Sequence, residues 1–308
     1  MMIFTYNKFY YNSIIMKIID CFMYYDEDMV LDIRLNILNK YVSHFIICEA
    51  NFNHNGTKRE FLFDINKFSK FREKIIYLQL NDKPQNLKEL KDSDSKLVKN
   101  SKILDNALER ENFQRNFLKS KIQDFEDNDL IIISDVDEIP NLNNFKYKAK
   151  ITLFEQKMFY YKLNLLHKDF HWYGSKICKK KDLISPQWLR NVKSKKYPFW
   201  RFDIFFSDRK YNNLNVIKNG GWHFTNIKTP EKIDFKMKNF LHHLEYEESG
   251  LGVEDVKKIV SEKKVFYDHS ADKKSKKWKV ATKLIKEDYK SLPDYISLNK
   301  SKFKDWLD

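Results

Sequence analysis

Glycine, proline and cysteine are scarce in this chain of 308 residues, which has six glycines, six prolines and three cysteines. Few glycines and prolines argue against many domains joined by linkers, and no repeat of solenoid or propeller length is visible. Cys21, Cys48 and Cys178 are odd in number and far apart, so their spacing indicates neither a disulfide framework nor a zinc site. We expect buried free thiols and a reducing compartment.

Long apolar runs are also missing. No segment reaches the roughly eighteen apolar residues of a membrane-spanning helix, and residues 1–16 lack the apolar core of a signal peptide. We therefore expect a soluble, cytoplasmic protein. The sequence also has no P-loop, no dinucleotide-binding glycine motif, no serine-hydrolase elbow and no zincin helix, which excludes the usual forms of those enzyme classes.

Basic residues are in excess: 57 Lys and Arg stand against 43 Asp and Glu, a net charge of +14. Such a charge suits nucleic acid, an acidic membrane surface or a phosphorylated substrate, and it equally serves solubility. A dense basic run at residues 273–279 keeps a nucleic-acid-binding protein as one hypothesis and a peripheral membrane contact as another. Nucleic acid is the less favoured partner, because the run lacks the interleaved aromatic side chains of a single-strand binder.

Apolar segments alternate with helical patterns, which predicts a doubly wound α/β fold. The segment 129–134 (DLIIIS) is typical of a central parallel strand buried on both faces. Further strands are expected at 17–22, 44–49, 74–80, 151–163 and 198–206, helices at 26–42 and 106–125, a surface loop at 81–104, and mainly helix from residue 230 onward.

Two carboxylates follow the predicted central strand directly. Asp135 and Asp137 are two residues apart, so on an extended backbone they point the same way. The carboxyl edge of an open α/β sheet is where ligands bind, and paired carboxylates suit Mn²⁺ or Mg²⁺, which in turn bind phosphate oxygens. A solvated turn that ends the strand is the alternative interpretation, and a metal-dependent phosphoesterase uses the same motif.

Further candidates lie downstream. In the segment Gly220-Gly221-Trp222-His223-Phe224, the glycines permit a ligand to approach, Trp222 offers a plate for a sugar face, and His223 is a candidate metal ligand. Lys236 is placed to neutralise a phosphate, and Glu245 is a candidate general base. Taken singly, each is more typical of a packing or surface residue.

Several segments together resemble glycosyltransferase family 17, the group that contains the enzyme adding the bisecting N-acetylglucosamine to N-glycans. The resemblance runs from about residue 17 to about residue 307, and the S-D-V-D-E-I-P stretch is its most specific part. The matching segments are Ile19–Phe22, Leu31–Leu35, Phe45–Glu49, Gln114–Asn116, Ile133–Pro140, Gly221–Phe224 and, more weakly, Leu292–Ile296.

This resemblance implies a GT-A-like, Rossmann-like fold with a mostly parallel central sheet and a helical, lysine-rich C-terminal part. It implies a UDP-sugar donor, with N-acetylglucosamine favoured, an oligosaccharide or glycoprotein acceptor, inversion at the anomeric carbon, and Mn²⁺ (or Mg²⁺). The anchor and stem of the animal Golgi members are not seen here. We expect an N-terminal extension at residues 1–16, a catalytic domain at 17–270, and a basic helical extension packed on it at 271–308.

The resemblance also implies roles for single residues. Asp137 is the expected direct metal ligand, Asp135 bonds the metal through water or contacts the donor ribose, and His223 completes the metal shell. Glu49 and Arg115 are expected to hold the nucleotide or the metal-site carboxylates.

The remaining roles concern the phosphates, the proton and the sugars. Lys236 is expected at the donor phosphates. Inversion requires a carboxylate that takes the acceptor proton, for which Glu245 is the first choice and Asp169 the second. Trp172 and Trp222 are the expected sugar-stacking side chains.

Overall fold

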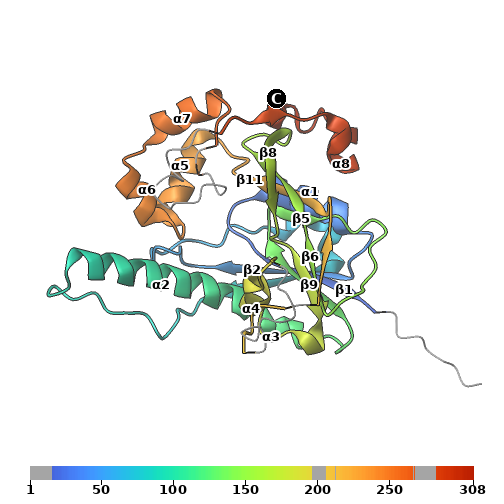
Figure 1. Cartoon of the computed structure of the whole chain (residues 1–308), viewed down its shortest axis with the longest axis horizontal. Coiled ribbons are helices and arrows are strands. Elements are labelled where there is room, and N and C mark those ends of the chain that lie inside the picture. The colour runs from blue at the N-terminus through green and yellow to red at the C-terminus, as the bar shows by residue number, and fades with distance from the viewer. Residues whose placement is uncertain (1–15, 196–205, 212, 266, 268–281) are drawn as a thin grey trace, which may run out of the picture.

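The computed structural model describes residues 16–195, 206–211, 213–265, 267 and 282–308, which Figure 1 draws in colour. In chain order the strands are β1 (Ile18–Met23), β2 (His44–Ala50), β3 (Ile75–Leu80), β4 (Leu130–Asp135), β5 (Glu138–Pro140), β6 (Ile151–Phe154), β7 (Gln156–Tyr160), β8 (Leu165–Trp172), β9 (Lys176–Lys179), β10 (Leu214–Ile217), β11 (Gly221–Thr225) and β12 (Ile285–Lys286). The helices are α1 (Asp28–Leu38), α2 (Lys96–Phe117), α3 (Lys119–Ile122), α4 (Pro186–Asn191), α5 (Pro230–Asn239), α6 (His243–Ser249), α7 (Val253–Ser261) and α8 (Asp294–Leu298).

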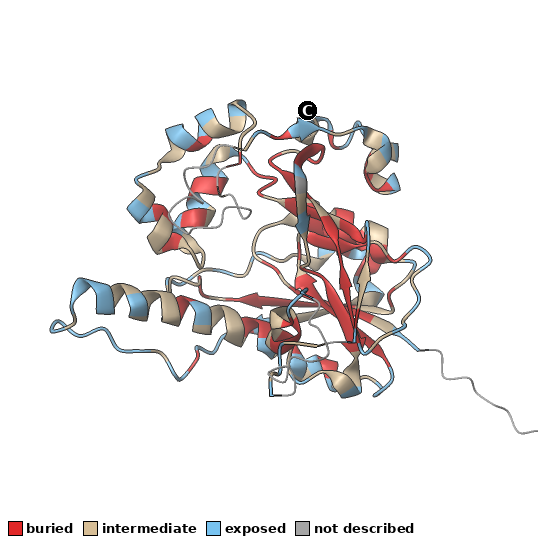
Figure 2. Cartoon of the chain, in the orientation of Figure 1, coloured by how far each residue is buried: buried red, intermediate tan, exposed pale blue. Residues whose placement is uncertain are grey.

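The predicted α/β fold with a mostly parallel central sheet is confirmed. The seven-stranded sheet has the order β10-β6-β9-β4-β1-β2-β3, and β9 is its one antiparallel member. β1 lies between β2 and β4 and is parallel to both. Figure 2 shows the strands of this sheet as mostly buried, as their continuous apolar runs require.

The structure has a second, five-stranded sheet, of order β12-β8-β7-β11-β5. Strand β5 follows β4 after a turn of two residues, so one continuous segment passes from the first sheet into the second. β11 pairs antiparallel with β5, which sets His223 opposite Glu138. The second sheet thus places His223, a residue late in the chain, next to the carboxyl end of β4.

Close packing between β11 and β5 depends on Gly221. Its φ is +140°, and a Cβ atom there would lie 2.1 Å from the carbonyl oxygen of Ile139. The sequence predicted that this glycine admits a ligand. In the structure it admits the neighbouring strand instead.

Two expectations about helices and loops need correction. The helix expected at 26–42 is shorter, Asp28–Leu38. The segment 81–104 is not all loop, because α2 begins at Lys96, where the Ser95 side chain accepts a hydrogen bond from the backbone of Val98. The first turns of α2 face solvent, so they carry no apolar periodicity; Leu97 is 82 % exposed.

The later part of the chain is helical at first, as predicted: α5, α6 and α7 lie together on one side of the molecule (Figure 1). The basic run at 273–279 lies outside the described residues, as does all but the last residue of the strand expected at 198–206. Residues 282–308 hold β12 and the short helix α8, and their side chains Leu292, Ile296 and Phe303 enter the same core cluster as α1. The division into a catalytic domain and a C-terminal extension stays a prediction.

Two smaller expectations can be compared with the structure. All three cysteines are buried and free. Within the described ranges, no helix has the length and apolar character needed to span a membrane.

A buried ion pair ties α1 to the central sheet. The Arg34 side chain and the Asp20 side chain of β1 are both 0 % exposed. Nε of Arg34 donates to Oδ2 of Asp20 at 2.8 Å and Nη2 donates to Oδ1 at 2.6 Å, a bidentate pair. In the folded protein each of these two buried charges is stabilised by the other instead of by water. Removing one side chain would therefore leave the other as an unpaired buried charge.

The same guanidinium group also holds the turn after β4. Nη1 of Arg34 donates to the carbonyl oxygens of Glu138 at 2.7 Å, Asp135 at 3.0 Å and Val136 at 3.3 Å. Nη2 adds a bond of 2.6 Å to the Ser134 hydroxyl. The backbone that carries the paired carboxylates is therefore fixed from behind by a single side chain.

We expect Arg34→Met to lower the free energy of unfolding by about 3–5 kcal/mol, because it leaves Asp20 buried without a counter-charge. Urea denaturation measures the change. Arg72→Met is the matched control: Arg72 is exposed, and its loss should change stability by about 0.5 kcal/mol or less. Equal effects of the two substitutions would contradict the role given to Arg34.

Candidate active site

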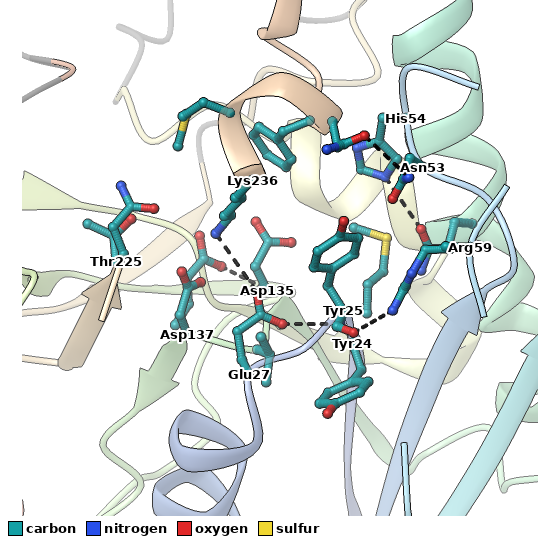
Figure 3. Close-up of a pocket in the computed structure, with 18 of the residues that line it drawn as sticks. Tyr24, Tyr25, Glu27, Asn53, His54, Arg59, Asp135, Asp137, Thr225 and Lys236 are labelled. Atoms are coloured by element: carbon teal, nitrogen blue, oxygen red, sulfur yellow. Dashed lines mark hydrogen bonds and ion pairs between the residues drawn. The ribbon is translucent and has the colours of Figure 1, made fainter. Parts of the chain in front are cut away.

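A cavity opens at the carboxyl edge of the central sheet. Its walls come from the loops after β1 and β2, the turn between β4 and β5, strand β11 and helix α5. Figure 3 shows Glu27, Asp135 and Asp137 gathered at one end, with Lys236 reaching toward them from α5. The location is the one at which open α/β sheets bind ligands.

Asp137 faces His223 in this acidic end. Nε2 of His223 lies 3.6 Å from Oδ2 of Asp137, and the backbone oxygen of Asp137 accepts a hydrogen bond from Phe224 at 2.8 Å. Burial acts to raise the pKa of Asp137, but His223 and then Lys236 outweigh it and hold the pKa below its ordinary value. Both side chains are largely buried and both line the cavity, so the structure brings these two predicted site residues together.

Asp135 is held differently, by two arginines. Oδ1 accepts from Nη2 of Arg115 at 3.0 Å and Oδ2 accepts from Nη2 of Arg190 at 2.8 Å. Burial opposes ionisation here too, yet Arg190 and Arg115 keep the pKa of Asp135 well below its usual range. Arg115 does contact one of the paired carboxylates, but it lies behind the cavity wall and does not line it.

Arg190 and Glu138 were not singled out from the sequence. Arg190 contacts both oxygens of Glu138, through Nη2 to Oε1 at 2.6 Å and Nη1 to Oε2 at 3.0 Å. Trp172 donates its indole N–H to Oε1 of Glu138, and its ring centre lies 5.3 Å from that of His223. Arg190 comes from the short helix α4, whose sequence carries no motif that could have pointed to this contact.

A further carboxylate at the acidic end, that of Glu27, was also not singled out from the sequence. Its Oε2 accepts from the backbone N–H groups of Tyr25 and Asp26, both at 3.1 Å. Its Oε1 lies 3.4 Å from Nζ of Lys228 and 3.8 Å from Nζ of Lys236. Burial raises the pKa of Glu27 despite the nearby Lys236.

The expected nucleotide contact Glu49 lies behind the cavity. It is fully buried, and its carboxylate accepts from Arg59 at 2.8 Å, from the Tyr77 hydroxyl at 2.7 Å and from two backbone N–H groups. Arg59 does line the cavity and lies over the Tyr25 ring at 4.1 Å. Glu49 therefore acts on the cavity indirectly, by orienting Arg59.

The far end of the cavity is formed by the loop after β2. Figure 3 shows His54, Asn53 and Arg59 at this end. Burial lowers the pKa of His54, and its Nε2 lies 3.4 Å from Oε1 of Gln114. Nδ1 of His54 and Oδ1 of Asn53 are buried atoms without a hydrogen-bond partner among the described residues, which is uncommon for polar groups.

Other expected residues lie elsewhere. Trp222 neighbours His223 on β11 and therefore points to the opposite face, where it donates to the carbonyl of Ser291 at 3.1 Å. Glu245 lies in the first turn of α6, 3.5 Å from Nδ1 of His242, and does not line the cavity. Asp169 lies in β8, and its side chain is outside the described part of the structure.

The donor atoms of the acidic end fit a divalent cation only in part. No group of three or more His, Cys, Asp or Glu side chains among the described residues is arranged to hold a metal by itself. Asp137 and His223 supply one carboxylate and one imidazole, whereas both oxygens of Asp135 already accept from guanidinium groups. Such a set suits a cation that takes its other ligands from substrate phosphates and water.

Lys176 supports the helix that carries Arg190. This side chain is buried, and its Nζ donates to the carbonyl oxygens of Arg190 and, at 2.7 Å, Val192. Burial and the neighbouring Arg190 lower the pKa of Lys176 to about 7. A neutral amine has two N–H groups, which match the two carbonyls that it contacts.

This shift predicts a pH dependence of stability. Above about pH 7 folded Lys176 is neutral, while in the unfolded chain it stays protonated up to about pH 10.4. The unfolded state then binds more protons, so the contribution of Lys176 to stability rises with pH in that window, by at most about 1.4 kcal/mol per unit. The difference in unfolding free energy between wild type and Lys176→Met, measured in urea at pH 7, 8 and 9, should grow in favour of wild type. A constant difference would contradict the lowered pKa.

A comparison with known protein families identifies the family of this chain. The family model described as glycosyltransferase family 17 matches residues 7–307, nearly the whole chain. A search of curated proteins finds no match. With this match over an α/β fold whose cavity lies at the carboxyl end of β4, the chain belongs to glycosyltransferase family 17.

Proposed function

We propose that this glycosyltransferase is metal-dependent and inverting, and that it moves a sugar, with N-acetylglucosamine favoured, from a UDP-sugar to a hydroxyl group of an oligosaccharide or glycoprotein. Membership of the family implies transfer from a nucleotide sugar. The proposal of a metal-dependent transfer is supported mainly by one observation. Asp137 and His223 lie side by side in the cavity, which Lys236 also lines.

The acidic end is the proposed place of the donor diphosphate. Asp137 and His223 would hold Mn²⁺ or Mg²⁺, and a cation there would offset the charge that develops on the departing UDP. Lys236 adds a positive charge from α5 on the same side. Asp135, held by two arginines, is assigned to orienting the turn rather than to direct metal binding.

The far end of the cavity is the proposed place of the nucleoside. Tyr25, with Arg59 over its ring, offers a flat surface, and Asn53 and His54 carry buried acceptor atoms without a hydrogen-bond partner among the described residues. These features suit a planar base with polar edges. Trp172, whose ring centre lies 5.3 Å from that of His223, is assigned to the donor sugar because it lines the cavity beside a proposed metal ligand.

We expect Asp137→Asn to reduce transfer by at least about a hundredfold, because the amide removes the negative charge that would bind the cation and leaves the shape unchanged. A panel of UDP- and GDP-sugars is tested with Mn²⁺, with and without EDTA, by thermal shift and by release of nucleotide. Wild type should be stabilised by a UDP-sugar, and EDTA should abolish the effect.

Asp124→Asn is the matched control, since Asp124 is exposed and does not line the cavity. It should leave binding and transfer unchanged. Most of the activity surviving in Asp137→Asn, or full activity in EDTA, would overturn the metal role. Absence of any response to a nucleotide sugar would overturn the proposed function as a whole.

A further inference from the structure

A second cavity adjoins the first and shares a wall with it. Both cavities are lined by Glu27, Asp137, Asn226 and Lys236. The second cavity lies between the N-terminal end of α1 and the segment that joins β11 to α5. A molecule in it would therefore meet a molecule in the first cavity at these four side chains.

The lining of the second cavity combines charged groups with two aromatic residues, Phe224 and Trp306. Asp26, Lys228 and Lys232 supply hydrogen-bonding groups, and Trp306 contributes an indole from the C-terminal segment. Nζ of Lys228 donates to Oδ1 of Asp26, so this lysine presents no free positive charge to the cavity, and the cavity does not select strongly for an anion. Hydroxyl groups next to an apolar ring face, as in a sugar, match this combination.

Glu27 is the carboxylate on the shared wall. Two backbone N–H groups fix its Oε2. Its Oε1 is 3.4 Å and 3.8 Å from the two lysine Nζ atoms, longer than the usual 2.7–2.9 Å of a charged hydrogen bond, so a hydroxyl can approach that oxygen. The burial that raises its pKa also makes it a better proton acceptor.

Resting on the proposed function, we propose that the second cavity binds the acceptor sugar and that Glu27 is the catalytic base of the transfer. The acceptor hydroxyl gives its proton to Oε1 of Glu27 while its oxygen bonds to the anomeric carbon of the donor. The bond from that carbon to the diphosphate oxygen breaks, and its electron pair leaves with UDP.

This assignment replaces Glu245, the first choice of base from the sequence. Glu245 lines neither cavity, whereas Glu27 lines both. Trp306 likewise takes the place of Trp222, whose indole is turned toward Ser291.

The test measures kcat and KM with UDP-N-acetylglucosamine (or the UDP-sugar that stabilises wild type), Mn²⁺ and an N-glycan oligosaccharide. Glu27→Gln should lower kcat by about a hundredfold or more, while the Kd for UDP, from calorimetry, stays within about threefold of wild type. A smaller loss of kcat overturns the base assignment. A large loss of UDP affinity also overturns it, because Glu27 would then be a donor ligand.

Three further variants complete the test. Glu27→Asp withdraws the carboxylate by about 1.5 Å, and should lower kcat with UDP affinity intact even if the Gln variant fails to fold. Glu231→Gln, an exposed carboxylate on α5, is the control and should match wild type. Trp306→Ala should raise the acceptor KM about tenfold and leave the donor KM unchanged; an unchanged acceptor KM overturns the acceptor site.

The failure of this inference differs from the failure of the proposed function. Wild type that transfers sugar, together with an equally active Glu27→Gln variant, refutes the base alone. Wild type that neither binds nor uses a nucleotide sugar refutes both.

Discussion

The buried contact between Arg34 and Asp20 is the constraint on which the site depends. Asp20 lies in the middle of the central sheet, so the arginine is placed by a rigid element and not by a loop. Through the same guanidinium group, the turn between β4 and β5 loses its freedom to move relative to α1. The side chains that this turn presents to the cavity therefore need no reorganisation when a substrate binds, which is the condition for effective electrostatic catalysis.

The acidic side chains near the cavity fall into two groups. Asp20, Glu49 and Asp135 each accept charge-assisted hydrogen bonds from arginine at 3.0 Å or less, and their work is to hold loops and turns. Among the described residues, the basic side-chain nitrogens nearest to the carboxylates of Asp137 and Glu27 lie 3.4 Å away or more. This difference in distance separates the carboxylates already used by the fold from those still available for chemistry, which a count of acidic residues does not reveal.

Sequence patterns predicted the features that depend on residues close together in the chain. They missed the contacts that depend on how distant segments pack. The first four strands were placed within about a residue or two, since their apolar runs are local signals. Arg190 and Glu27 were missed because their positions follow from how distant segments pack. Trp222 is instructive: adjacent residues of a strand face opposite sides, so it could not share a cavity with His223, and the sequence already contained that information.

The pairing of β5 with β11 has a consequence for biosynthesis. β5 ends at residue 140 and its partner begins at residue 221, a separation of 221 − 140 = 81 residues. At about 5–20 residues per second, a ribosome needs roughly 4–16 seconds to supply the partner strand. During that time the segment after the carboxylate turn has an unpaired edge of the kind that promotes aggregation. The nascent chain thus exposes the carboxylate turn and β5 before β11 has been made. The last third of the protein supplies the strand that pairs with β5 and completes the site.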